Sequence, residues 1–143
     1  MSTIEKTVAI AAGAHEGQTD KAGKVYLLHP LRLMLQVQED EEHIVAVLHD
    51  VVEDSDWTLE DLRVEGFSEP ILTAIDSVIR RQEETYDDFI RRAGENPIGR
   101  QVKLADLKDN CDLGRITSPT AEDRARVAKY ERAIARLEES PCR

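Results

Sequence analysis

Four ionisable side chains follow an apolar segment in the middle of the chain: residues 44–48 are all apolar, and they lead directly to His49, Asp50, Glu53 and Asp54. On a helix, His49 and Glu53 would lie one turn apart, and the two aspartates would form a second stripe beside them. Buried charges are costly unless they are paired or bound to a cation, so a divalent metal ion is one way to accommodate these groups. The other interpretation is a helix that leaves the core and ends in solvated polar residues, and the pattern alone leaves both open.

One helix cannot supply every ligand of a metal ion, so other segments must contribute. His29, directly before Pro30, and Asp106, at the end of an apolar helix face, are the candidates. Either alone is a weak signal, because a histidine before a proline is usually a loop residue. We assign His15 to the C-terminal dipole of the first helix and expect His43 to be solvated.

Helices must position these residues, because apolar residues recur at helical spacing along most of the chain. The first helix is expected over roughly residues 3–14 and the last over about residues 120–139, and Thr58 has the spacing of an N-cap with Asp61. No period-2 pattern indicates a strand, although the apolar run at 44–48 does not by itself exclude one. We therefore expect an all-α fold of about eight helices, in a single domain over residues 1–143.

Charge and composition restrict the partners. The formal net charge of −10 argues against nucleic acid or an anionic membrane, since both require clustered Lys and Arg, but a small phosphorylated substrate is compatible with it. Cys111 and Cys142 do not form a disulfide framework, and neither a membrane-spanning run nor a secretory signal is recognisable. We expect a cytoplasmic protein with reduced thiols, and the sequence leaves open whether it forms a homo-oligomer.

The ionisable motifs occur in the order and spacing of a known family. They are His15-Glu16-Gly17-Gln18, Tyr26, His29-Pro30, Leu48-His49-Asp50-Val51-Val52-Glu53-Asp54, Lys103-Leu104-Ala105-Asp106 and Asn110. Over roughly residues 5–135 they resemble the HD-superfamily hydrolase domain of RelA/SpoT enzymes. The absence of synthetase or regulatory motifs makes the chain look most like the stand-alone small alarmone hydrolases, such as the metazoan SpoT homologue.

The resemblance implies a helical HD-type bundle and a bound metal ion. By carry-over, Mn²⁺ is expected between His29, His49, Asp50 and Asp106, a set of imidazoles and carboxylates that suits this ion. Members of the family remove the 3′-pyrophosphate of ppGpp or pppGpp and leave GDP or GTP. The resemblance therefore predicts a metal-dependent phosphohydrolase that acts on a small nucleotide.

The same resemblance implies roles for further residues. Glu53 and Asp54 would position and deprotonate the attacking water, and which of them also returns a proton to the leaving oxygen stays open. For Arg126 the alternative interpretation is a solvated residue on a charged helix, and for Tyr130 it is a core position on an amphipathic helix. The expected substrate contacts are Lys21, Tyr26, Asn110, Arg126 and Tyr130.

Three departures from the family pattern concern the nucleobase. Asp20 replaces the usual arginine that packs on guanine, which removes a planar cation and adds a negative charge. Val25 replaces the usual proline before Tyr26, and after Asp106 the usual Arg-Leu-His-Asn becomes residues 107–110, Leu-Lys-Asp-Asn. The base preference therefore stays open. The alternatives are the same chemistry on another phosphorylated nucleotide, such as ppApp or NADPH, and a non-catalytic alarmone-binding module.

Overall fold

The computed structural model describes residues 3–112 and 118–139, and the regular secondary structure within these ranges is helical. The only extended pairing in the described residues is an isolated bridge between Thr19 and Val25. The predicted all-α class is confirmed, and so is the number of helices. They are α1 (Ile4–Ala14), α2 (Leu28–Gln36), α3 (Asp40–Asp54), α4 (Leu59–Val64), α5 (Glu69–Ser77), α6 (Tyr86–Glu95), α7 (Pro97–Asn110) and α8 (Ala121–Glu139).

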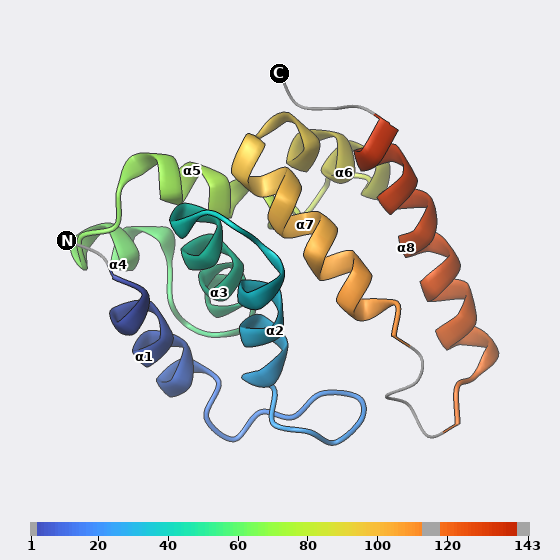
Figure 1. Cartoon of the computed structure of the whole chain (residues 1–143), viewed down its shortest axis with the longest axis horizontal. Coiled ribbons are helices and arrows are strands. Elements are labelled where there is room, and N and C mark those ends of the chain that lie inside the picture. The colour runs from blue at the N-terminus through green and yellow to red at the C-terminus, as the bar shows by residue number, and fades with distance from the viewer. Residues whose placement is uncertain (1–2, 113–117, 140–143) are drawn as a thin grey trace.

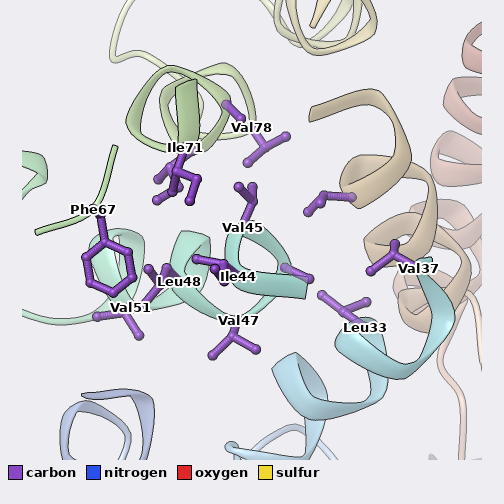
Figure 2. Close-up of a cluster of buried hydrophobic side chains, with 14 of the residues drawn as sticks. Leu33, Val37, Ile44, Val45, Val47, Leu48, Val51, Phe67, Ile71 and Val78 are labelled. Atoms are coloured by element: carbon purple, nitrogen blue, oxygen red, sulfur yellow. The ribbon is translucent and has the colours of Figure 1, made fainter. Parts of the chain in front are cut away.

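Helix α3 is the centre of the fold and packs against α1, α2, α5 and α7 (Figure 1). A capping box between Glu39 and Glu42 starts it. Ile44 is 6% exposed and residues 45–48 are fully buried, so the helix is apolar around most of its circumference. Figure 2 shows its side chains among those of Leu33 from α2 and Ile71 from α5. The apolar run at 44–48 is therefore a buried helix, and the strand that the pattern had left open is excluded.

Helix α7 joins two packing units. On one side it contacts α2, α3 and α5, and on the other it contacts α6 and α8 (Figure 1). The second unit has its own small core, made of Phe89, Ile90, Leu104, Leu107, Ala133 and Leu137. Because α7 lies between the two units, residues on its inner face are brought against α2 and α3.

The N-cap predicted at Thr58 is confirmed. Thr58 accepts a hydrogen bond from the backbone N–H of Asp61, as expected for the N-cap of α4. Cys111 is a free thiol, whereas Cys142 lies outside the described residues. No helix in the described part of the chain is long and apolar enough to cross a membrane.

The position of α7 depends on a close approach to α5 at Gly99. A Cβ atom at Gly99 would overlap the hydroxyl of Ser77, which is itself buried and donates to the carbonyl of Ala74 at 2.6 Å. Glycine is therefore required here for space, although it is a poor helix former. The contact fixes how far the start of α7 stands from α5.

We predict that Gly99→Ala lowers the free energy of unfolding by about 1–3 kcal/mol, because overpacking outweighs the better helix propensity of alanine. Gly13→Ala in α1 is the matched control, since nothing lies within 4 Å of an added Cβ there. We expect this control to be neutral or stabilising. Urea denaturation measures both, and the explanation is wrong if adding Ser77→Ala to Gly99→Ala recovers none of the loss.

Candidate metal and catalytic site

Three helices bring the four predicted metal ligands together. His29 comes from the first turn of α2, His49 and Asp50 from α3, and Asp106 from α7. All four are buried, and none is more than 8% exposed. The Nε2 atom of His29 lies 3.0 Å from an oxygen of Asp106 and 3.5 Å from Asp50, and the Nε2 atom of His49 lies 3.3 Å from Asp50. Residues separated by up to 77 positions in the sequence thus form one cluster.

Both imidazoles are held so that Nε2 faces the carboxylates. The Nδ1–H of His49 donates to the carbonyl of Ala46 at 2.9 Å. The Nδ1–H of His29 donates to the carboxylate of Asp109 at 2.6 Å. A metal-bound histidine usually has its second ring nitrogen tied in this way, which fixes the tautomer and the ring orientation. The histidines are therefore prepared to bind a cation through Nε2.

Asp50 is the least satisfied group of the cluster. Its Oδ2 atom is buried and accepts no hydrogen bond. Burial raises the pKa of Asp50, and the charge of Asp106 acts in the same direction against the effect of His49. An oxygen left in this state favours a bound cation, and the surrounding donors fit one. Asp50, Glu53 and Asp54 also offer three oxygens that lie within 4.8 Å of one another.

The charges around Asp106 compensate its burial. Burial opposes ionisation, but the Lys103 ammonium at 3.1 Å and the hydrogen bond from His29 hold the pKa of Asp106 well below its usual range. Burial would also lower the pKa of His29, yet its hydrogen bond to Asp106 and the charges of Asp106 and Asp50 raise it to about 9. The cluster thus stabilises positive charge between its carboxylates.

A cavity of about 420 Å³ opens beside the cluster. It is lined by His29, Asp50 and Asp106 of the metal set and by Glu53, whereas His49 and Asp54 lie outside its lining. Desolvation in the cavity raises the pKa of Glu53, even though the residue as a whole is exposed. The structure brings all five predicted substrate contacts to this cavity, namely Lys21, Tyr26, Asn110, Arg126 and Tyr130.

These contacts differ in how firmly they are held. Asn110 donates to Asp106 at 3.1 Å, and Arg126 pairs with Asp123 at 2.9 Å on the same turn of α8. Lys21 is exposed at the cavity mouth, whereas Tyr130 is half-buried. Arg126 and Tyr130 are therefore neither plain surface nor plain core positions, because both reach the cavity.

Tyr26 lines the cavity and also contacts Asp54, one of the two predicted catalytic carboxylates. Its hydroxyl donates to Oδ2 of Asp54 at 3.2 Å. Burial, followed by the nearby charge of Asp50, raises the pKa of Tyr26, so the phenol stays protonated and can only donate to Asp54. The phenol is thus a fixed donor to one of the two predicted catalytic carboxylates.

Asp20 has a structural role in the cavity wall. Its Oδ1 atom accepts the backbone N–H groups of Ala22 at 2.8 Å and Lys24 at 2.9 Å, which folds the tip of the loop that carries Lys21. The sequence interpretation treated Asp20 only as a lost arginine with added repulsion. The carboxylate also builds the loop, because it bonds backbone groups that would otherwise be unpaired.

Three residues of the site were missed in the sequence. Asp109 lies one turn after Asp106 and holds His29 from the other side, and Arg32 donates to both oxygens of Asp109 at 2.9 and 3.1 Å. Lys103, quoted only as part of a motif, is the ammonium that pairs with Asp106. The i, i+3 spacing of the two aspartates was the available signal for Asp109.

The two remaining histidines have hydrogen-bond partners that the sequence did not indicate. His43 is half-buried, and its Nε2–H donates to the carbonyl of Val37 at 3.0 Å, so it is not simply solvated. His15 is the C-cap of α1 but is only 1% exposed. Its Nδ1 atom also bonds the side chain of Gln18 at 2.9 Å, a contact that the helix-end interpretation did not include.

Comparison with known proteins gives relatives named as guanosine-3′,5′-bis(diphosphate) 3′-pyrophosphohydrolases and others named as GTP pyrophosphokinases. A guanosine-3′,5′-bis(diphosphate) 3′-pyrophosphohydrolase of Aquifex aeolicus is 33% identical over 119 residues, which cover 75% of this chain. A protein of the same name from Vibrio cholerae is 32% identical over 113 residues, or 76% of this chain. The chain spans only 17% and 16% of these relatives. No family model matches the chain.

A solved structure supports the fold. It belongs to a protein described as a metazoan orthologue of SpoT that hydrolyses ppGpp and plays a role in starvation responses. The TM-score is 0.75 at 22% identity, and the match covers 96% of this chain and 85% of that one. The all-α fold and the buried cluster of two histidines and two aspartates are those expected of an HD-type domain. With its sequence relatives, the chain belongs to the HD-type hydrolase domains of the RelA/SpoT proteins.

We predict that Asp109→Asn weakens Mn²⁺ binding by about tenfold, because the ring of His29 loses its charged partner. Asp40→Asn is the control, since Asp40 is an exposed carboxylate at the start of α3. Isothermal titration calorimetry measures both affinities. Equal affinities of Asp109→Asn and wild type would show that Asp109 does not support the metal site.

Proposed function

We propose that this chain is a Mn²⁺-dependent hydrolase that removes the 3′-pyrophosphate of guanosine alarmones. The products are GDP from ppGpp, or GTP from pppGpp, and pyrophosphate. The observation that carries the proposal is the convergence of His29, His49, Asp50 and Asp106 beside Glu53, at a cavity large enough for a nucleotide. The names of the relatives support the same reaction.

His29, His49, Asp50 and Asp106 are the residues that would hold the metal ion. Two neutral imidazoles and two carboxylates satisfy the ligand preference of Mn²⁺. When bound, the ion lowers the pKa of water and offsets charge on the phosphate oxygens. The buried Oδ2 atom of Asp50, which accepts no hydrogen bond, supports this assignment.

Glu53 and Asp54 are the groups that would move protons. The oxygen of water forms a bond to the phosphorus next to the 3′-oxygen, and the bond between this phosphorus and the 3′-oxygen breaks. The water proton passes to one of the two carboxylates, and the leaving 3′-oxygen takes up a proton. Because Tyr26 donates to Oδ2 of Asp54, the other oxygen of this carboxylate is the one that can accept a proton.

Cationic side chains around the cavity would bind the phosphate groups. Lys21 is exposed at the mouth, and Arg126 reaches the cavity from α8. Asn110 and Tyr130 line the part of the wall formed by α7 and α8 and would contact the sugar. Lys21 and Arg126 thus place positive charge at the cavity of a protein whose formal net charge is −10.

A second substrate class has support from one observation. Asp20 occupies the cavity wall where the family usually carries a guanine-stacking arginine, and its carboxylate is committed to the loop by Ala22 and Lys24. The base-binding contact must therefore differ from that of the family. This difference favours testing adenine alarmones such as ppApp, and NADPH, next to the guanine compounds, and a binding module without turnover is the remaining alternative.

We further propose that residues 1–143 act as a single domain in the cytoplasm, with a nucleotide as partner and without nucleic acid or membrane. The net charge of −10 supports this view. A homo-oligomer is compatible with it, and light scattering of the purified protein would give its mass.

The first test is pyrophosphate release from ppGpp by the purified protein with Mn²⁺. We expect turnover that stops when the metal is chelated, and a loss of kcat by about a hundredfold or more in Glu53→Gln, because proton transfer is removed. Retained nucleotide binding in Glu53→Gln completes the expected pattern. If the wild type binds alarmones but releases no pyrophosphate from ppGpp, ppApp or any other nucleotide of the panel, the chain is a binding module.

The second test concerns the charge of Asp20. Asn keeps a side-chain oxygen that can accept from Ala22 and Lys24, so Asp20→Asn removes the charge and retains the loop. We expect the KM for alarmones to fall several-fold at low salt, by about 1 kcal/mol in binding, because repulsion from phosphate is removed. An unchanged KM at low ionic strength would mean that Asp20 does not face the phosphates.

A further inference from the structure

The loop between α1 and α2 is folded into a narrow hairpin-like turn. The backbone N–H of Tyr26 donates to the carbonyl of Gln18 at 2.9 Å, and that of Asp20 donates to Lys24 at 2.8 Å. Gly17 precedes the turn with φ +84°, a conformation that favours glycine. Gln18 and Tyr26 are therefore held directly opposite each other at the base of the loop.

Both of these residues bond Asp54. The side-chain amide of Gln18 donates to the backbone carbonyl of Asp54 at 3.1 Å, across 36 residues of sequence. The hydroxyl of Tyr26 donates to Oδ2 of the same residue at 3.2 Å. Asp54 ends α3, so its carbonyl has no hydrogen-bond partner within the helix. Without the bond from Gln18, the last turn of α3 would fray more easily. One loop thus fixes the backbone and the carboxylate of Asp54 together.

His15 sets the orientation of the Gln18 amide. Since the nitrogen of that amide donates to Asp54, its oxygen is the acceptor, and the Nδ1–H of His15 donates to it at 2.9 Å. His15 is 1% exposed and Gln18 is half-buried, so the contact is partly shielded from water. The ring of Tyr26 packs between the rings of His15 at 5.0 Å and His29 at 5.8 Å. The chain of contacts runs from α1 to the end of α3 and to the metal set.

We propose that His15, Gln18 and Tyr26 are positioning residues that fix Asp54 for the hydrolysis of the 3′-pyrophosphate. This inference rests on the proposed function, because it concerns Asp54 as a group that acts on the attacking water. It gives a role to the His15-Glu16-Gly17-Gln18 motif, and it adds a second role to Tyr26. The tip of the same loop carries Lys21 into the cavity wall, so substrate contact and the placement of Asp54 share one element.

The first experiment compares Gln18→Met and Tyr26→Phe with wild type. Met keeps the volume of Gln18 and removes both of its side-chain hydrogen bonds, and Phe keeps the ring of Tyr26. We expect kcat for ppGpp to fall about tenfold in each variant, because a misplaced reacting group costs rate. For Gln18→Met, the KM and the affinity for Mn²⁺ are expected to stay within about twofold of wild type. Gln101→Met, the same change at an exposed residue of α7, is the matched control.

The second experiment places Gln18→Met in an Asp54→Ala background. A positioning role predicts no further loss of the residual single-turnover rate, because the group that Gln18 positions is already absent. A general structural role predicts that the two losses multiply. Multiplying losses, or a loss of Mn²⁺ affinity in Gln18→Met, would overturn the inference.

The third experiment does not depend on turnover. In the peptide covering residues 48–56, hydrogen exchange should be faster in Gln18→Met than in wild type, because the last turn of α3 opens more often. Exchange in α6 should be the same in both proteins. If wild type hydrolyses no nucleotide but Gln18→Met still speeds hydrogen exchange at the end of α3, the proposed function is wrong. The contacts of His15, Gln18 and Tyr26 with Asp54 are then structural, and their catalytic role is wrong as well. If wild type turns over but neither variant changes kcat or exchange, the inference fails and the proposed function stands.

Discussion

The buried carboxylates of Asp50 and Asp106 are the constraint on which the site depends. Placing two negative charges out of water on neighbouring helices is unfavourable, and each must be compensated by groups fixed in the fold. Lys103 compensates Asp106, and His29 lies between the two carboxylates. One oxygen of Asp50 accepts no hydrogen bond, which is the chemical reason to place a cation there. The arrangement of α2, α3 and α7 is thus set by charge as well as by apolar packing.

Much of the fold could be predicted from the sequence, because helical periodicity and capping residues are local signals. Thr58 and the apolar run at 44–48 are examples, although the run became certainly helical only in the structure. The motifs predicted four metal ligands, and the structure brings these four residues together. What the motifs could not supply is the distance between helices, since packing partners such as Ser77 and Gly99 carry no sequence signature.

The sequence interpretation was incomplete at three residues for a common reason. His15, His43 and Asp20 were each interpreted from their neighbours in the chain, as a helix-end charge, a solvated residue and a repulsive substitution. Each has a hydrogen-bond partner that the spacing did not indicate: Gln18 for His15, the Val37 carbonyl for His43, and backbone amides for Asp20. Asp109 was overlooked for the same reason, because its partners His29 and Arg32 lie on α2.

The turn between α1 and α2 divides into two parts with different freedom to change. At its base, Gln18 and Tyr26 form hydrogen bonds to Asp54 at the end of α3. The tip around Lys21 takes part in neither of these two hydrogen bonds. Substitutions, and even changes of length, at the tip can therefore accumulate without moving Asp54. Ligand preference can therefore diverge through the tip of the turn while Gln18 and Tyr26 keep Asp54 in place.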